Sequence, residues 1–251
     1  MVKTEPSTKD SLAVFDVDGT LFRRGLLPAL TRRLVNEGIY SERVREELSR
    51  DYYAWVERRG SYDTYDRLVV DLFLRELNGV TVADLQRCAR AEVEAHGRRL
   101  HMYTRDVALR LKHAGHQLVA ISGSPQEILD LFLKPLGFDR SWGTVLAQDD
   151  KGCYTGEVLH YPFENKRQVL EEFLQEANID LEGSVGMGDT LSDVGFLEMV
   201  WTPIAFNPNR DLLEVARQRG WPIVVERKDV IYNLQTPLND PVLKDGTLWM
   251  G

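Results

Sequence analysis

Asp16 and Asp18 lie two residues apart, directly after the apolar run of residues 12–15, and Gly19 follows them. Because side chains alternate along a strand, carboxylates at this spacing can point to one side. One can then attack as a nucleophile while the other gives or takes a proton. The glycine permits a sharp turn that aims both groups at a ligand. The segment therefore predicts a catalytic pair, although Asp-x-Asp-Gly is also common in purely structural turns.

A second acidic pair, Asp189 and Asp193, follows the apolar segment 184–187. These acids could face the same cleft as Asp16 and Asp18 if both segments are strands of one parallel sheet. Carboxylate oxygens are the ligands that magnesium prefers, so the acids are candidate metal ligands. Asp193 could equally be a first-turn acid that favours the dipole of a following helix.

Three further residues could oppose the charge of a phosphate. Ser122 and Gly123 lie between a predicted strand and a predicted helix, where a hydroxyl and a backbone N–H can meet an anion. The same turn also suits a structural role, with Ser124 as the helix cap and Pro125 at the first helical position. Lys166 could supply an ammonium group, although a single lysine is more often a solvated surface residue.

The order of the predicted elements indicates an α/β fold. Residues 26–97 read as a module of four short helices, with Ser41, Ser61 and Thr81 as plausible N-caps. On either side, apolar strands alternate with helices, as in parallel sheets with helical crossovers. The predicted strands are 12–15, 117–121, 144–147, 154–158, 184–187, 204–205 and 223–225. We therefore predict a doubly wound, Rossmann-like core.

The domain boundaries follow from this change between a purely helical pattern and alternating strands and helices. The core is expected to comprise residues 1–25 and 98–228, and the helical insertion, residues 26–97, would cover the active site as a cap. Residues 229–251 contain isolated prolines and no sustained periodicity, so they are predicted to form a C-terminal tail.

Four segments together resemble the motifs of the haloacid dehalogenase superfamily. Residues 16–21 (DVDGTL) are similar to its first motif, 121–124 (ISGS) to its second, Lys166 to its third, and 188–193 (GDTLSD) to its acidic fourth. They occur in the family's order and cover almost the whole core. A helical insertion between the first two motifs is typical of the phosphoserine-phosphatase-like branch.

The resemblance implies a magnesium-dependent phosphatase. In that reading Asp16 attacks phosphorus, Asp18 protonates the leaving oxygen, and water then hydrolyses the aspartyl-phosphate. Magnesium would be held by Asp16, the main-chain carbonyl of Asp18 and Asp189, with Asp193 supporting the metal site. Ser122, Gly123 and Lys166 would bind phosphate. The expected enzyme is a phosphoric monoester hydrolase.

The substrate is expected to be a small phosphorylated metabolite, with phosphoserine-like compounds among the candidates. Strict phosphoserine specificity is doubtful, because Gly25 stands where that branch has a Glu and Asp71 stands near the position of its cap arginine. Arg23, Arg24 and cap tyrosines are weaker candidates for substrate contact. Alternatives are a phosphotransferase that uses the same intermediate, and a phospholigand-binding regulatory protein with little turnover.

Composition restricts the remaining function classes. The formal charge of −8 and the pI near 5.3 give no basic field, so nucleic acid is not an expected partner. Cys88 and Cys153 form no CxxC pair, which argues against a disulfide framework or zinc site. No signal-like or membrane-spanning apolar stretch is seen, so a cytoplasmic protein is expected. The oligomeric state is left open.

Overall fold

The computed structural model describes residues 10–177 and 179–234. Its centre is an eight-stranded sheet in the order β4-β3-β2-β1-β5-β6-β7-β8. The strands are β1 (Asp10–Phe15), β2 (Gln117–Pro125), β3 (Arg140–Gln148), β4 (Tyr154–His160), β5 (Ile179–Gly188), β6 (Thr202–Phe206), β7 (Ile223–Arg227) and β8 (Val230–Asn233). Neighbours from β3 to β7 are parallel, and β4 and β8 are antiparallel edge strands. The predicted doubly wound α/β core is confirmed.

Strand β1 is buried on both faces, as its continuous apolar run predicted. Ala13 and Phe15 contribute to one hydrophobic cluster, whereas Leu12 and Val14 contribute to another on the opposite face. The first cluster includes side chains of α5 (Met102–His113) and α6 (Gln126–Leu133), and the second those of α7 (Lys166–Glu176), α8 (Val194–Leu197) and α9 (Arg210–Arg219). Helices therefore cover both faces of the sheet.

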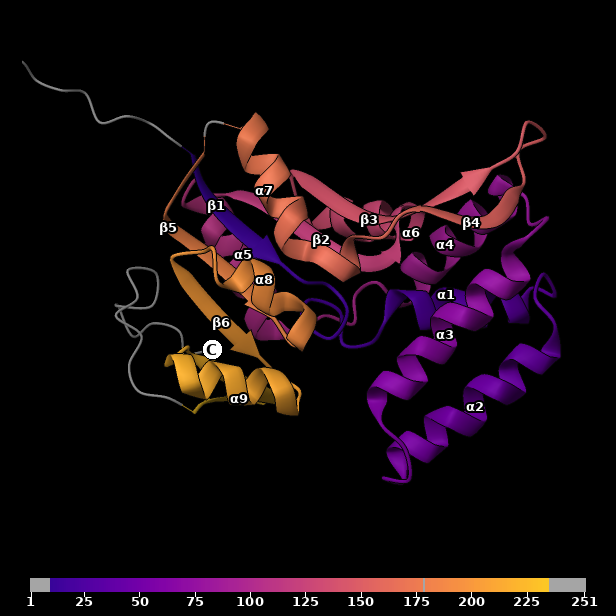
Figure 1. Ribbon diagram of the computed structural model, residues 1–251, viewed down its shortest axis with the longest axis horizontal. Coiled ribbons are helices and arrows are strands. Elements are labelled where there is room, and N and C mark those ends of the chain that lie inside the picture. The colour runs from indigo at the N-terminus through magenta and orange to yellow at the C-terminus, as the bar shows by residue number, and fades with distance from the viewer. Residues whose placement is uncertain (1–9, 178, 235–251) are drawn as a thin grey trace, which may run out of the picture.

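Four helices lie between β1 and β2: α1 (Leu26–Asn36), α2 (Glu42–Val56), α3 (Tyr62–Leu77) and α4 (Val82–His96). Ser61 and Thr81 cap α3 and α4 by accepting from backbone N–H groups, whereas Ser41 makes no such bond before α2. Figure 1 shows this insertion gathered at one end of the sheet, with α2 farthest out. That it acts as a separate cap domain stays a prediction.

The insertion is joined to the core by apolar packing. One continuous cluster contains Leu30 of α1, Leu85 of α4 and Phe132 of α6, and α4 packs against α6. Phe22, just before α1, packs edge-to-face against Phe132, with the ring centroids 5.3 Å apart. The β3–β4 hairpin also packs along α3. These contacts fix the helices over the ends of β1 and β2.

The structure differs from the predicted elements at two places. Residues 230–233 of the predicted tail form β8, which pairs with β7 through a short turn. The helix that was expected to have Asp193 in its first turn is a 3-10 turn, Leu191–Asp193, followed by the four-residue α8. Residues 235–251 of the predicted tail lie outside the described residues. Among the described helices, none has the length and apolar character needed to cross a bilayer.

Candidate active site

The predicted site residues follow the carboxyl ends of three neighbouring strands. Asp16 directly follows β1, Ser122 lies near the end of β2, and Asp189 directly follows β5. The chain leaves β1 for β2 on one side, while β5 lies on the other, so this is the point where the strand order reverses. Ligand sites of open α/β sheets form at such points. A bond from Asp16 N to Met187 O, 2.9 Å long, fixes the first loop against β5.

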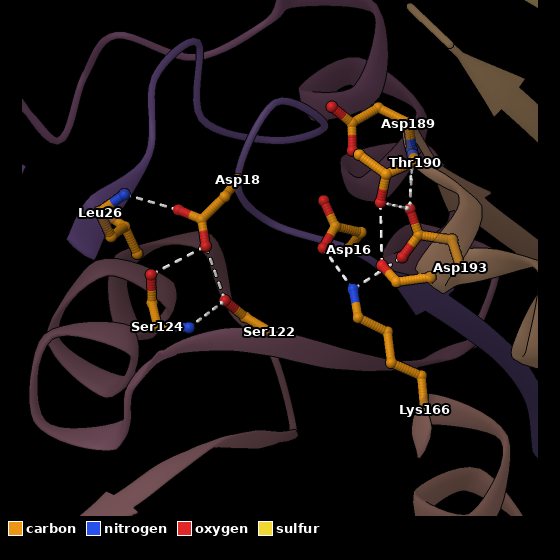
Figure 2. A network of polar contacts seen from close by, with 10 residues as sticks. Asp16, Asp18, Leu26, Ser122, Ser124, Lys166, Asp189, Thr190 and Asp193 are labelled. Carbon is orange, nitrogen blue, oxygen red and sulfur yellow. Dashed lines mark hydrogen bonds and ion pairs between the residues drawn. The ribbon is translucent and has the colours of Figure 1, made fainter. Parts of the chain in front are cut away.

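Lys166 lies between two of the acids (Figure 2). Its Nζ donates to Asp16 Oδ1 at 2.6 Å and to Asp193 Oδ1 at 2.7 Å. The side chain is fully buried at the start of α7. Burial alone would lower the pKa of Lys166, but the two carboxylates raise it above the usual lysine value. The lysine therefore remains charged and holds Asp16 in place.

Asp193 anchors the loop after β5. Its Oδ2 accepts from the backbone N–H groups of Asp189 and Thr190, each at 2.9 Å, while Oδ1 faces Lys166. Thr190 and Asp193 cap one another reciprocally at the start of the 3-10 turn. Of the two roles that the sequence left open for Asp193, the structure has the helix-start role, and it adds a pair with Lys166. A role of Asp193 in binding metal stays a prediction.

Asp16, Asp189 and Asp193 form a group in which one carboxylate oxygen of each lies within 4.8 Å of the others. Asp16 Oδ2 is buried and has no hydrogen-bond partner in the described part of the chain. Burial raises the pKa of Asp16 to about 7 against the lowering effect of Lys166, and burial with neighbouring carboxylates raises the pKa of Asp189 well above its usual value. Such a cluster has more negative charge than Lys166 can balance. Its donors suit a hard cation.

Two glycines allow the acids to come this close. Gly19 has φ +89°, and a Cβ there would lie 2.1 Å from Asp189 Oδ2. At Gly188 a Cβ would lie 2.4 Å from Cβ of Asp193. A side chain at either position would displace a carboxylate, so both glycines are required by the packing of the site.

Asp18 faces away from the acidic group (Figure 2). Its Oδ2 accepts from the hydroxyls of Ser122 at 2.7 Å and Ser124 at 2.8 Å, and its Oδ1 accepts from Leu26 N at 2.6 Å. Burial raises the pKa of Asp18, and these three donors oppose that rise. The side chain of Asp18 is therefore not part of the acidic group, which leaves its main-chain carbonyl as the predicted metal contact.

These contacts connect the site with the insertion. The residue before α1 is Gly25, which has no side chain to cap the helix, and Asp18 supplies the acceptor for Leu26 N instead. Ser124 Oγ accepts from the next amide, Leu27 N, at 3.1 Å. Ser124, which was predicted to cap the helix that follows it, instead accepts from the first turn of α1. The helix that follows it, α6, has no side-chain cap among the described residues.

Replacing Asp18 should separate these roles. Asp18→Ala removes the acceptor of Leu26 N and leaves the Ser122 and Ser124 hydroxyls without it, so we expect a loss of about 1–2 kcal/mol in the free energy of unfolding. Asp18→Asn keeps an acceptor oxygen and should lose less, while both variants lose the proton donor. Denaturant unfolding of the two variants checks this. Equal stabilities would contradict the capping role.

The acids open into a cavity of about 270 Å³. Gly123 and Ser124 line it with Asp16, Asp18 and Asp189, whereas Lys166 and Ser122 lie beneath its surface. The wall also includes Arg67, which with Arg75 was a candidate substitute for the cap arginine, and residues that sequence reasoning did not assign to the site: Asp66, Tyr161, Phe163, Asn209 and Asp211. They come from α3, the segment before α7, and the start of α9. No spacing in the sequence links these elements to the motif residues.

The sequence pattern of the haloacid dehalogenase-like hydrolases matches residues 13–198, which contain every residue of the acidic group. The chain belongs to this haloacid dehalogenase-like hydrolase family. The expectation of a hydrolytic enzyme of this superfamily is thereby confirmed. The four segments quoted from the sequence all lie within the matched range.

Two curated proteins are similar to this chain over different lengths. The chain is 37% identical over 112 residues to the inhibition of morphological differentiation protein of Streptomyces azureus. The aligned region covers 44% of this chain and 40% of that protein. It is 26% identical over 232 residues to the histidinol-phosphatase of Neisseria meningitidis, covering 85% of this chain and 98% of that protein. The chain thus spans less than half of the first relative and nearly all of the second.

A solved structure agrees with this fold. A phosphoserine phosphatase bearing an analogue of its phospho-aspartyl intermediate superposes with a TM-score of 0.59 at 21% identity. The match covers 88% of this chain and 95% of that one. The predicted branch, a haloacid dehalogenase-like core with a helical insertion, is therefore confirmed at the level of the fold.

Proposed function

We propose that this haloacid dehalogenase-like hydrolase is a magnesium-dependent phosphomonoesterase that acts on a small phosphorylated metabolite. One observation carries the proposal: a buried lysine fixes one oxygen of Asp16, an acid of the group at the cavity, while the other oxygen, Oδ2, has no hydrogen-bond partner among the described residues. A carboxylate held in this way is positioned to attack an electrophile. The family and the name of the Neisseria relative agree with phosphate as that electrophile.

The reaction has two displacements. Asp16 Oδ2 attacks phosphorus, the bond from phosphorus to the alcohol oxygen breaks, and Asp18 gives its proton to that oxygen. Water then attacks the aspartyl-phosphate, Asp18 takes a proton from the water, and phosphate leaves Asp16. Asp18 reaches the leaving oxygen only after turning away from at least one of its three donors, Leu26 N, Ser122 or Ser124.

Magnesium fits the donor set. The carboxylates of Asp16 and Asp189 would hold it with the main-chain carbonyl of Asp18, and Asp193 would support them through its bonds to the loop. When bound, magnesium supplies positive charge that offsets the phosphate and the acids. Lys166 adds fixed positive charge beside Asp16, and Gly123 at the cavity wall offers room for phosphate oxygens.

The walls of the cavity argue against strict phosphoserine specificity. Gly25 lines the cavity and has no side chain where that branch has a Glu, and Asp71 is exposed and does not line it. Arg67 of α3 does line it and is the cap arginine best placed to meet a substrate anion. Arg75, by contrast, pairs with Glu47 and Glu76 on the surface. A phosphomonoester other than phosphoserine is therefore the preferred substrate.

The proposal is tested by phosphate release from a panel of phosphomonoesters, with and without magnesium. We expect turnover that disappears with chelator, and inorganic phosphate that forms without an added acceptor alcohol. Acceptor-dependent product with little free phosphate would indicate a phosphotransferase. Binding without turnover on the whole panel would indicate a regulatory protein.

Asp189→Asn gives an independent test of the metal site. Because the pKa of Asp189 is raised in the folded state, its ionisation opposes folding, and stability is lost as pH rises through that pKa. Without metal, the variant should melt about 2–4 °C higher than the wild type at neutral to alkaline pH, which corresponds to about 1 kcal/mol. The difference should shrink in acid. Magnesium should stabilise the wild type and not the variant, and the opposite ranking would reject Asp189 as a ligand.

A further inference from the structure

A second, larger cavity lies beside the catalytic one. Its volume is about 760 Å³, against about 270 Å³ for the catalytic cavity. Gly25, Tyr62 and Asp189 line both cavities, so the second opens next to the acidic group. The amide next to Gly25, Leu26 N, contacts Asp18. An alcohol that leaves phosphorus with a proton from Asp18 therefore has this second cavity within reach.

Aromatic rings of α2 and α3 form much of its wall, and we call it the aromatic chamber. Its rings belong to Tyr52, Tyr53, Trp55, Tyr62 and Tyr65. Trp55 is central: its ring lies 5.1 Å from that of Tyr62, edge-to-face, and is parallel to that of Tyr65 within 10°. Tyr52, Tyr53 and Tyr62 remain 38%, 57% and 37% exposed. Such rings offer apolar faces and hydroxyl groups to a flat ligand.

The charged side chains of the aromatic chamber are mostly arginines. Arg23, Arg24 and Arg32 line it, and Asp189 is the one acid among the lining residues. Arg23 is held by Glu226 and by the carbonyl of Leu100. Among residues 10–177 and 179–234, Arg24 has no ion-pair partner. The chamber therefore favours a negatively charged occupant.

Arg32 is also available to an anion. Its Nη2 donates to Tyr65 Oη at 2.7 Å, and its guanidinium lies 6.0 Å from the centre of the Tyr52 ring. These contacts hold the group against aromatic rings without neutralising its charge, since neither partner is a carboxylate. Within the described part of the chain, no carboxylate forms an ion pair with it.

We infer that the aromatic chamber binds the leaving group of the substrate, and that this group is a planar ring bearing a second anionic substituent such as a carboxylate. The inference rests on the proposed function, because it places the phosphate in the catalytic cavity. A compact alcohol such as serine would leave most of about 760 Å³ to water. A cavity of that size suits a ligand of several rings or substituents.

The opposite side of the site offers a different occupant. A cavity of about 400 Å³ between α3 and the β3–β4 hairpin is lined mainly by apolar residues, including Val70, Phe73 and Val158. It shares Leu27 and Tyr161 with the catalytic cavity. A neutral alkyl leaving group would choose this apolar side. The aromatic chamber is preferred here because it combines rings with guanidinium groups, whereas the residues that line this apolar cavity include no arginine.

Binding of non-hydrolysable phosphonates to the wild-type protein tests the inference without depending on turnover. The probes are para-carboxybenzylphosphonate, benzylphosphonate, the cyclohexylmethyl analogue of the first, and hexylphosphonate, titrated calorimetrically with magnesium present. We expect para-carboxybenzylphosphonate to bind about tenfold more tightly than benzylphosphonate, as one charge-assisted contact provides. It should also bind about threefold more tightly than its cyclohexyl analogue. Equal or tighter binding of hexylphosphonate would overturn the inference.

Variants locate the preference in the aromatic chamber. The ratio to compare is the affinity for para-carboxybenzylphosphonate divided by the affinity for benzylphosphonate. Arg24→Gln and Arg32→Gln should each reduce this ratio by about fivefold or more. The matched control is Arg43→Gln, on α2 with three of the aromatic residues, with a side chain that is 83% exposed and outside the cavity walls. It should keep the ratio. A ratio unchanged by both chamber variants would overturn the inference.

Comparison with turnover separates the two proposals. Magnesium-dependent hydrolysis of phenyl phosphate, together with no preference among the phosphonates, would refute the inference and leave the proposed function standing. Preference for the carboxylated ring without hydrolysis of any ester would support the ligand class and refute the phosphomonoesterase.

Discussion

We expect Asp16→Asn to lower turnover of phosphomonoesters by at least about a thousandfold, or about 4 kcal/mol in the activation barrier. The amide that replaces the carboxylate is not anionic and cannot form the acyl-phosphate bond. The variant would also lose an oxygen of the proposed metal site, yet it should fold, because an amide can still accept from Lys166 through one oxygen. The measurements are steady-state phosphate release and covalent phosphorylation detected by intact mass.

The control for this prediction is Asp150→Asn, which removes an acid from the exposed turn between β3 and β4. It should turn over substrate within about twofold of the wild type, as expected for a surface substitution. Near-normal activity of Asp16→Asn, with a phosphorylated species still present, would show that another residue is the nucleophile.

Lys166→Met should have the largest effect on stability. Lys166 is 2% exposed and pairs with Asp16 and Asp193, so its removal leaves buried carboxylates unbalanced. Breaking a buried ion pair in this way destabilises a protein by about 3–5 kcal/mol, which corresponds to a fall of about 10 °C in melting temperature. Activity should fall as well, because Asp16 loses its fixed orientation and the phosphate loses a positive charge.

Two comparisons show whether charge is the cause. Lys112→Met removes a surface lysine that pairs with Asp139, both side chains being about one third exposed, and should change the melting temperature by about 2 °C or less. The double variant Lys166→Met/Asp193→Asn should recover part of the stability by removing one unbalanced carboxylate. If the double variant is less stable than the sum of its single changes, the lysine acts mainly by packing.

The motif residues could be placed from the sequence because they follow strands that are easy to recognise. Short apolar runs followed by polar residues predict strand ends, and parallel strands bring their carboxyl ends to one edge of a sheet. That reasoning placed Asp16, Ser122 and Asp189 at one edge, where the structure has them. The roles assigned to them remain predictions that the variants above test.

Other features depended on contacts between distant segments. The carboxylate of Asp18 accepts from the amide of Leu26, which lacks a side-chain cap of its own because α1 begins after Gly25. The sequence did not predict this contact, and the acid–base role expected of Asp18 stays a prediction. Likewise, the four residues of β8 have no apolar alternation of their own and gain their order by pairing with β7. Local periodicity in the sequence predicts neither a side-chain contact to a distant helix start nor the pairing of a short edge strand.

The apolar cluster shared by α1, α4 and α6 limits how this enzyme can open. Swinging the whole insertion away would expose side chains such as Leu30, Leu85 and Phe132 to water, at about 25 cal/mol for each Å² of apolar surface. Of the four helices, α2 has the fewest buried side chains, Val44 and Leu48, and it contacts the other helices of the insertion rather than the sheet. This outer helix carries three of the chamber's rings. Local displacement of α2, with α1 and α4 still packed on the core, is therefore the motion that would admit a substrate at the lowest cost in free energy.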